Sequence, residues 1–459
     1  MFGKKTINIV DTKVRNGNTV VFKLSYPRSI KKYLASDYIY AEYSTRIDCV
    51  DESILNIPAV ASLVPLAWAV GADLSVKKLD KTFVESLNRV KPVFKKWHSN
   101  FSFSTRIGVE EVVHNKFSNK GYALLFSGGL DSTVSYIRNK KKKPILIFIR
   151  GLDILTKNRA LWNNAKAQVL AFSKQEDVKV YFVKSNIREL FYDNLLSVEF
   201  GQSWWVRVSH GLTLIGLCAP LSKEGFGTLL IASTRGPQQP GEKRPPLGSS
   251  PLIDEKLSWA DIKVVHDSYD LNRQQKIKYV LKKYAKNGHH PFLRVCTEGK
   301  NSLNCGKCKR CLPTIAGLAL EGIDPNKCGL KMDNQTLANL KQSFIDKKYQ
   351  IFENDVISPN FLYRTDDWKE IQNEIPKGIT IDLYNSKEFF EWLRNFDLTS
   401  YGNKMERKMQ NDRLLKVLKW RLIGCVLSVY YALPKGQQNA TKKLLDYGCH
   451  KKITTLLGM

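Results

Sequence analysis

Apolar runs of five or six residues alternate with longer helical patterns through the middle of the chain, residues 119–330. The predicted strands are 122–126, 145–149, 178–183, 228–233 and 262–267, and the predicted helices are 132–138, 158–174 and 204–221. Strands separated by helices indicate a parallel sheet with helices on both faces. The loops that follow such strands build the binding site, and the Pro/Gly-rich loop 236–251 is one of them.

Two further segments flank this α/β region. The chain has 459 residues, too many for one ordinary core, so we expect two or three domains. Residues 1–118 are predicted to form a mixed α+β domain, with strand-like alternation at 7–10 and 19–24 and a helical pattern at 80–97. Residues 331–459 are predicted to be mostly helical. The expected fold class is therefore α/β, with a doubly wound parallel sheet between these two segments.

The composition narrows the classes of partner. Lys and Arg number 72 against 43 acidic residues, a net charge of +29, which favours a polyanionic partner or an anionic substrate. The excess is spread over the whole length, so nucleic-acid binding is the less favoured of the two. The N-terminus lacks the apolar core of a signal peptide, and the longest apolar stretch, near 422–433, is too interrupted to span a bilayer. We expect a cytoplasmic protein with no membrane partner, in which clustered cysteines indicate metal rather than disulfides.

The stretch LLFSGGLDSTVS, residues 124–135, places two glycines between a predicted strand and a predicted helix. Glycines allow a sharp turn and close approach of a ligand, and the free N–H groups of the helix point at whatever lies over the turn. Ser127, Ser132 and Thr133 add hydroxyl groups, so the arrangement fits a phosphate or pyrophosphate. We expect Asp131 to hold Mg²⁺ or to cap the turn. An ordinary tight turn is the alternative, and the spacing matches neither the Walker pattern nor GxGxxG.

At these residues the chain resembles a known family: SGGLDS is similar to the SGGxDS signature of the PP-loop ATP pyrophosphatases. The resemblance implies a PP-loop (HUP-type) fold and cleavage of ATP between its α- and β-phosphates, with adenylation of a carbonyl or carboxyl oxygen. It also implies that the signature residues hold the departing pyrophosphate with Mg²⁺. The nucleotide-binding residues expected on this basis are Phe126, Ser127, Gly128, Gly129, Leu130, Asp131 and Ser132.

Four cysteines lie within sixteen residues, in VCTEGKNSLNCGKCKRC. Cys305, Cys308 and Cys311 form two overlapping Cys-x-x-Cys units, and Cys296 is expected to arrive from a preceding strand and to complete a tetrahedron. Four thiolates fit a closed structural Zn²⁺ site. An iron–sulfur cluster is the competing interpretation. The other five cysteines are read as ordinary thiols.

The PP-loop motif followed by Cys-x₈-Cys-x₂-Cys-x₂-Cys resembles the 7-cyano-7-deazaguanine synthase (QueC) family over about residues 119–330. That family adenylates 7-carboxy-7-deazaguanine and forms an amide and then a nitrile with ammonia, and its metal is a structural zinc. The present chain departs from it in its two added segments and in the loop 236–251. In this it resembles the extended QueC-like components of bacterial anti-phage systems such as Qat and CBASS. That branch implies joining the activated deazaguanine to an amine of a partner protein.

Cations near the predicted sheet edge are further candidates. Arg235 ends a strand and Lys243 lies in the Pro-rich loop, where either could neutralise charge as the adenylate forms; solvated loop charge is equally consistent. With Asp131 and Ser132 they make up the expected catalytic set. Arg150 and Asp153 follow the second strand, where the resemblance places adenosine; Asp153 would accept a hydrogen bond from the ribose or be an ordinary turn acid.

Three other features have mainly structural interpretations. His210 could be a base or a substrate contact, but a histidine among aromatic residues on a helix is more often part of the core. Asp254 could contact a substrate or a metal, but it is expected instead to cap a helix. The basic segment 404–421 is predicted to be an amphipathic helix with a solvated outer face, and RNA or an acidic partner is its alternative role.

Together these features predict an ATP-dependent ligase that adenylates a carboxylate, releases pyrophosphate and lets a nitrogen nucleophile displace AMP. Its cofactors would be ATP, Mg²⁺ and Zn²⁺, and its partners a deazapurine carboxylate and a protein acceptor. The main alternative is a tRNA-modifying PP-loop enzyme, such as a thiolase, which would suit the basic charge. A glutamine-dependent synthetase would need a glutaminase domain, and a non-catalytic scaffold would not need an intact SGGLDS.

Overall fold

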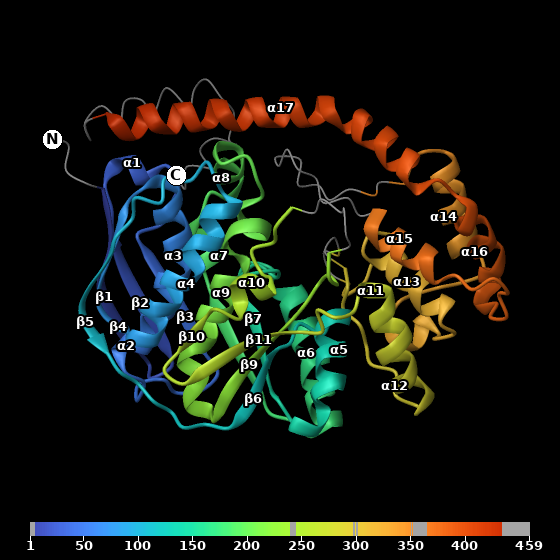
Figure 1. Ribbon diagram of the computed structural model, residues 1–459, viewed down its shortest axis with the longest axis horizontal. Coiled ribbons are helices and arrows are strands. Elements are labelled where there is room, and N and C mark those ends of the chain that lie inside the picture. Colours follow the sequence, from blue (N-terminus) through green and yellow to red (C-terminus); the bar gives the residue numbers. More distant parts are fainter. Residues whose placement is uncertain are drawn as a thin grey trace.

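A computed structural model of the protein describes residues 5–238, 245–296, 299, 302–349, 351 and 365–433 (Figure 1). Within these residues one sheet of eleven strands runs in the order β10-β11-β9-β6-β7-β8-β3-β2-β1-β4-β5. The strands are β1 Thr6–Arg15, β2 Thr19–Ser25, β3 Tyr38–Tyr43, β4 Asp73–Asp80, β5 Ile107–Val113, β6 Gly121–Leu125, β7 Ile145–Arg150, β8 Val180–Ser185, β9 Phe226–Ala232, β10 Ser258–Trp259 and β11 Ile262–Asp267. Six of the ten pairings between these described strands are parallel. The expected α/β class is confirmed at this level.

The five strands predicted between residues 119 and 330 form a continuous run of parallel strands, β11-β9-β6-β7-β8. Successive side chains point to opposite faces: Leu124 and Leu146 pack under α5 (Leu130–Asn139) and α6 (Arg159–Glu176), whereas Ala123 and Ile147 face the core that contains α9 (His210–Cys218). Helices therefore cover both faces. The helix predicted at 204–221 is present as a π-helical turn Trp204–Ser209, then α9, then a 3₁₀ turn Ala219–Glu224.

The N-terminal strands extend the same sheet, because β3 pairs antiparallel with β8, with Ala41 opposite Ser185. The helix α3 (Ile57–Val70) is apolar all round and is buried from Ile57 to Ala69, as such a helix must be, and it packs against α9. The helix α4 (Lys81–Trp97) begins where Asp80 accepts a hydrogen bond from the Phe83 N–H (2.9 Å). The described strands of residues 5–118 and 119–330 thus lie in one sheet, and both segments contribute to one large apolar core.

The C-terminal region is helical, as expected. The described helices after residue 330 are α14 Thr336–Ile345, α15 Thr365–Glu374, α16 Ser386–Asn395 and the long α17 Leu398–Ala432, and they pack with α13 Cys311–Leu320, which precedes them in the chain. They enclose a second apolar core around Phe344, Trp368 and Phe389, which also receives Leu130 from α5. Short helical segments complete the described chain: α1 Arg28–Lys31, α2 Glu52–Leu55, Lys140–Lys142, α7 Ile187–Leu190, α8 Asp193–Glu199, α10 Pro251–Asp254, Pro325–Cys328 and Leu383–Asn385. Among the helices described, none has both the length and the apolar character needed to cross a bilayer.

Candidate functional site

The Ser-Gly-Gly turn connects β6 to α5 at the carboxyl edge of the parallel strands. Gly128 has φ +71°, the left-handed conformation that glycine adopts at least cost, and Gly129 is the N-cap of α5 without any side-chain cap. The Ser132 hydroxyl accepts a hydrogen bond from the Ser127 N–H and lies 3.3 Å from the Ser127 hydroxyl. Since the first N–H groups of a helix have no partner inside it, the N-terminus of α5 favours an anion.

Two residues of the predicted nucleotide loop are structural anchors. Phe126 is 2% exposed and stacks on Phe172 of α6, with ring centroids 4.7 Å apart. Leu130 is 1% exposed and lies in the second core. The two side chains pack into different apolar cores on either side of the turn. Only the backbone at these two positions is therefore available to a ligand.

Asp131, in the first turn of α5, forms a cluster with two cations. Its Oδ1 lies 3.1 Å from Lys276 Nζ and its Oδ2 lies 3.2 Å from Arg273 Nη1. The Lys276 side chain is fully buried, and its ammonium also donates to the Ser233 carbonyl at the end of β9. Burial would raise the pKa of Asp131, but the positive charges of Lys276 and Arg273 outweigh it and lower that pKa. Asp131 is thus ionised and paired with cations, and it does not cap the turn.

Lys276 and Arg273 come from the first turn of a helix that follows β11. This continuous helix comprises α11 Arg273–Gln275, a π-helical turn Lys276–Leu281 and α12 Lys282–Lys286. It begins with a capping box in which Asn272 and Gln275 bond each other's backbone N–H groups (2.8 and 3.2 Å). Residues at i and i+3 share a helix face, which brings both cations to Asp131. Neither cation is among the site residues predicted from the sequence, although the Asn-x-x-Gln box after the fifth strand indicates a helix start at this position.

The cations that were predicted from the sequence, Arg235, Lys243 and Arg150, are not part of the Asp131 cluster that the structure describes. Arg235 follows β9, and its guanidinium donates to the Pro245 carbonyl (3.4 Å) within the Pro-rich loop. Lys243 lies outside the described residues. Arg150 ends β7, bonds the Thr156 carbonyl and lies over the Trp162 ring, 5.7 Å from its centroid. Arg150 therefore shapes its own loop at the sheet edge, next to Asp153, which is exposed.

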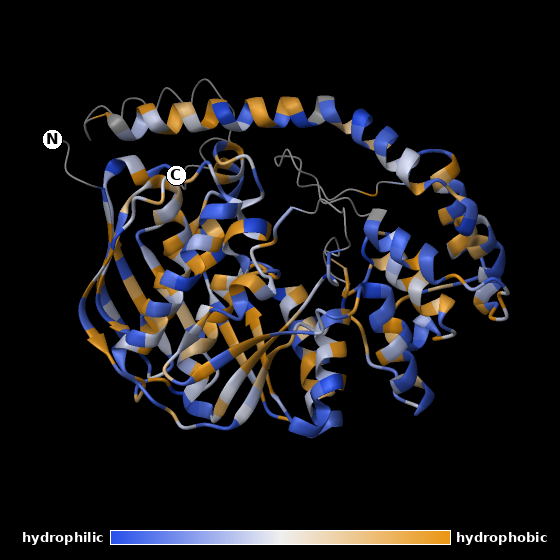
Figure 2. Ribbon diagram, in the orientation of Figure 1, coloured by the Kyte–Doolittle hydropathy of each residue, from blue (hydrophilic) through white to orange (hydrophobic). Residues whose placement is uncertain are grey.

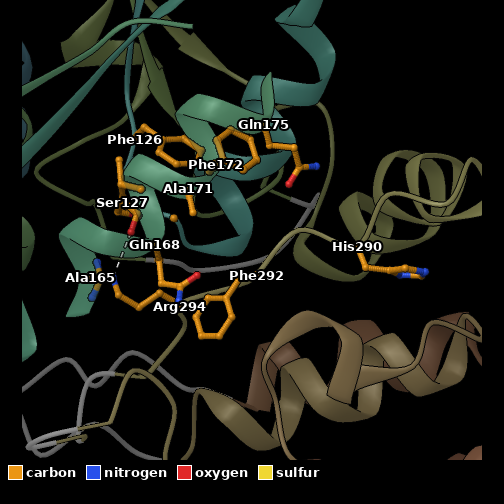
Figure 3. A pocket seen from close by; sticks show the side chains of 12 residues that line it. Phe126, Ser127, Ala165, Gln168, Ala171, Phe172, Gln175, His290, Phe292 and Arg294 are labelled. Atoms are coloured by element: carbon orange, nitrogen blue, oxygen red, sulfur yellow. Dashed lines mark hydrogen bonds between the residues drawn. The ribbon is translucent and has the colours of Figure 1, made fainter. Parts of the chain in front are cut away.

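A segment that leads to the cysteines runs over the glycine turn. The backbone N–H of Arg294 donates to the Gly128 carbonyl (2.7 Å), and its Nε donates to the Ser127 carbonyl (3.0 Å; Figure 3). Beside it lies a pocket of about 150 Å³ whose lining includes Phe172, Gln168 and Phe292. The strand expected before Cys296 is absent: residues 289–296 form an irregular connection, because their hydrogen bonds go to the turn and the cysteine loop.

The four cysteines come together as predicted. The Sγ atoms of Cys296, Cys305, Cys308 and Cys311 all lie within 4.8 Å of one another, which is a set that could hold a metal ion. Contact with Cys296 raises the pKa of the Cys308 thiol to about 11, so without a cation this sulfur resists ionisation. Gly306 has φ +73° in the turn between the ligands. Four buried or half-buried thiols at this spacing fit Zn²⁺ with no position left open.

Asn304 links the cysteine loop to the turn. Its side-chain oxygen accepts from the N–H groups of Val295 (3.0 Å) and Cys296 (3.3 Å), and its amide donates to the Leu293 carbonyl (2.7 Å). Arg294 lies in the middle of this bonded stretch. The loop that carries the cysteines therefore holds in place the segment that contacts the glycine turn.

A buried histidine–aspartate pair lies on the opposite face of the sheet. His266 Nδ1 is 2.8 Å from Asp254 Oδ2, and the same oxygen accepts from the Ser249 hydroxyl (2.7 Å). Asp254 ends α10 and bonds these side chains, so the expectation that it caps a helix is wrong. Burial lowers the pKa of His210, whose ring meets Trp205 edge to face at 5.0 Å. No sequence pattern indicates the His266–Asp254 pair.

Comparisons with protein-family models, curated proteins and solved structures find no match for this chain. The assignment of function therefore depends on the site itself. Its chemistry is that of an anion site: a helix N-terminus, two hydroxyl groups and two buried or half-buried cations at the edge of a parallel sheet.

Proposed function

We propose that the protein is an ATP-dependent ligase that adenylates a carboxylate on the Ser127–Ser132 turn. The observation that carries this proposal is the Asp131–Lys276–Arg273 cluster, which holds two cations beside the N-terminus of α5. Such a site is complementary to the two phosphates that leave when ATP transfers AMP. The PP-loop fold and the QueC-like relationship are part of this proposal and are based on SGGLDS and the cysteine spacing.

In the proposed reaction a carboxylate oxygen attacks the α-phosphorus, the α–β anhydride bond breaks and its electron pair leaves with pyrophosphate. The N–H groups of the turn, Lys276 and Arg273 hold that pyrophosphate, while Asp131 orients the two cations. An amine nitrogen then attacks the acyl adenylate, AMP departs and the nitrogen loses a proton. Rate enhancement comes from positioning and charge neutralisation.

The expected metals have different roles in this proposal. Mg²⁺ usually binds through one or two carboxylates and the phosphates of its substrate, and Asp131 would be the carboxylate that the turn offers, in which case the ion would replace Lys276 or Arg273 at one of its oxygens. The four cysteines would hold Zn²⁺ as a structural ion, which keeps Arg294 on the turn. Reduced thiols at this site are consistent with the cytoplasmic location that we propose.

The carboxylate proposed is 7-carboxy-7-deazaguanine, and the acceptor is an amine, either ammonia or one on a partner protein. The residues that we propose to contact this substrate are Arg188 and His210, which both lie against the Trp205 ring. The Arg188 guanidinium lies 4.7 Å from the centroid of the Trp205 ring, on residues that follow β8 and precede α9.

ATP–pyrophosphate exchange tests the proposal. The purified protein is given 7-carboxy-7-deazaguanine, tRNA or no acceptor, and exchange that requires the deazaguanine is the expected result. Lys276→Met should slow this exchange by about a hundredfold or more. Lys278→Met is the matched control, because Lys278 is on the same helical turn but pairs with Glu374 (2.6 Å), and it should leave exchange unchanged. Exchange that requires tRNA would favour the tRNA-modifying alternative, and no exchange with any of them contradicts adenylation.

A further inference from the structure

The longest helix of the protein, α17, bridges the two halves of the molecule (Figure 1). At its start Tyr401 and Met405 are buried in the C-terminal core. At its end Leu427 and Tyr430 are buried in the large core, where α17 lies against α1 and α8. Both ends of the helix are thus fixed by apolar packing, and its middle part presents an outer face to solvent.

That outer face is apolar. Five large side chains on it are between half and two-thirds exposed: Leu414 59%, Leu415 68%, Leu418 51%, Leu422 67% and Val429 61%. Cys425 is exposed as well. The positions 415, 418, 422, 425 and 429 are spaced alternately by three and four residues, which is the a/d pattern of a coiled-coil seam. We call these five positions the α17 seam; Figure 2 shows the apolar residues recurring along this helix.

The charges beside the seam have one sign. Lys419 and Arg421 lie on its two sides, at the e and g positions of the heptad, and both are exposed. No acidic residue occurs in the sequence between Arg413 and Leu433. Two copies of this helix would bring only positive charges together, so the flanks disfavour pairing with a second copy and favour acidic flanks in the partner.

The residue types in the α17 seam also favour a helix of another protein over a membrane surface as its binding partner. Helices that lie in a membrane surface carry Trp, Phe or Leu on their apolar face, and Trp is the residue enriched at the membrane interface. Here the aromatic residue of this stretch, Trp420, packs with Ile423 against the large core on the other side of the helix. The seam itself is aliphatic apart from Cys425, as a and d positions of coiled coils usually are.

We infer that the α17 seam is a docking surface for an amphipathic helix of another protein, one with an aliphatic a/d stripe flanked by Asp and Glu. The surface is independent of the glycine turn, and the inference does not rest on the proposed function. Bound there, a partner helix would cover the exposed leucines, and its acidic flanks would meet Lys419 and Arg421.

A synthetic peptide of about 28 residues, with Leu at a and d and Glu at e and g, is a direct probe. Fluorescence anisotropy with the full-length protein should show binding that weakens as salt is raised, and a peptide of the same composition in scrambled order should not bind. The double variant L415K/L422K should bind at least about tenfold more weakly. Both sites are on the surface, so folding is preserved, which circular dichroism checks. Ile345→Lys, at a half-exposed position on α14, is the matched control and should bind like the wild type.

Three outcomes would overturn the inference. One is equal binding of the ordered and scrambled peptides, or equal binding by L415K/L422K. Another is a dimer of the wild-type protein in sedimentation that L415K/L422K abolishes, because the seam would then bind a second copy. The last is that the wild-type protein binds phosphatidylserine vesicles but not the peptide, and that L415K/L422K does not bind the vesicles. A membrane would then be the partner.

Discussion

Removing the buried charge pair between Asp131 and Lys276 should reveal how strongly the site is held together. At 3.1 Å, an effective dielectric constant of about 20 gives an attraction of about 5 kcal/mol before desolvation. Burying the Lys276 ammonium offsets several kcal/mol of that, and Arg273 remains as a second partner for Asp131. We therefore expect a coupling energy of about 2 kcal/mol between Asp131→Asn and Lys276→Met.

A double-mutant cycle gives this coupling energy. The free energy of unfolding of each variant is measured by urea denaturation, with fluorescence of the buried core as the signal. The pair Arg138–Asp270 is the matched control: it joins the same helix α5 to a loop at 2.5 Å, but its side chains are 34% and 60% exposed. A surface pair of this kind should couple by less than about 1 kcal/mol. If the Asp131–Lys276 coupling is no larger than that of the control pair, burial does not strengthen the cluster and our reasoning about the site is wrong.

Three further predictions concern the four clustered cysteines, Arg294 above the glycine turn and the buried His98. Elemental analysis should find one zinc per chain; Cys308→Ser should abolish it and lower the free energy of unfolding by roughly 3–5 kcal/mol, whereas Cys49→Ser, at an exposed thiol, should change neither. Arg294→Ala loses the hydrogen bond to the Ser127 carbonyl, so calorimetry should show ATP binding weakened about tenfold with zinc content retained; unchanged affinity would contradict a role for this contact. Burial lowers the pKa of His98 from 6.5 to about 4, so the unfolded chain binds the proton first and stability is lost as pH falls from 6.5 toward 4. Between about pH 7.5 and about pH 5 this amounts to about 2 kcal/mol, which urea unfolding should detect and His98→Gln should remove; an equal loss in the variant would assign the effect to other groups.

Local patterns in the sequence were sufficient for the elements near the turn. The strand, the glycine pair and the helix start coincide in 124–135, and the structure has β6, the turn and α5 there. The helices predicted at 80–97 and 158–174 are α4 (Lys81–Trp97) and α6 (Arg159–Glu176). These segments have strong periodicity and defined ends, and the four cysteines are close in sequence, so short-range rules apply.

Contacts between distant segments could not be predicted in this way. The β3–β8 pairing, which continues the sheet into the N-terminal strands, joins residues more than a hundred positions apart. Lys276 lies 145 residues from Asp131, and only the folded sheet brings β11 and its following helix next to α5. The His266–Asp254 pair is closer in sequence, but nothing in a polar residue pair of this kind shows that both side chains will be buried.

The most direct measurement of the central claim is a crystal structure of the full-length protein with Mg²⁺ and a non-hydrolysable ATP analogue. We predict that the β- and γ-phosphates lie over the Ser127–Ser132 turn, accept hydrogen bonds from its N–H groups and contact Lys276 or Arg273. An analogue bound elsewhere, with the turn empty and the Asp131 cluster unchanged, would contradict the proposed site.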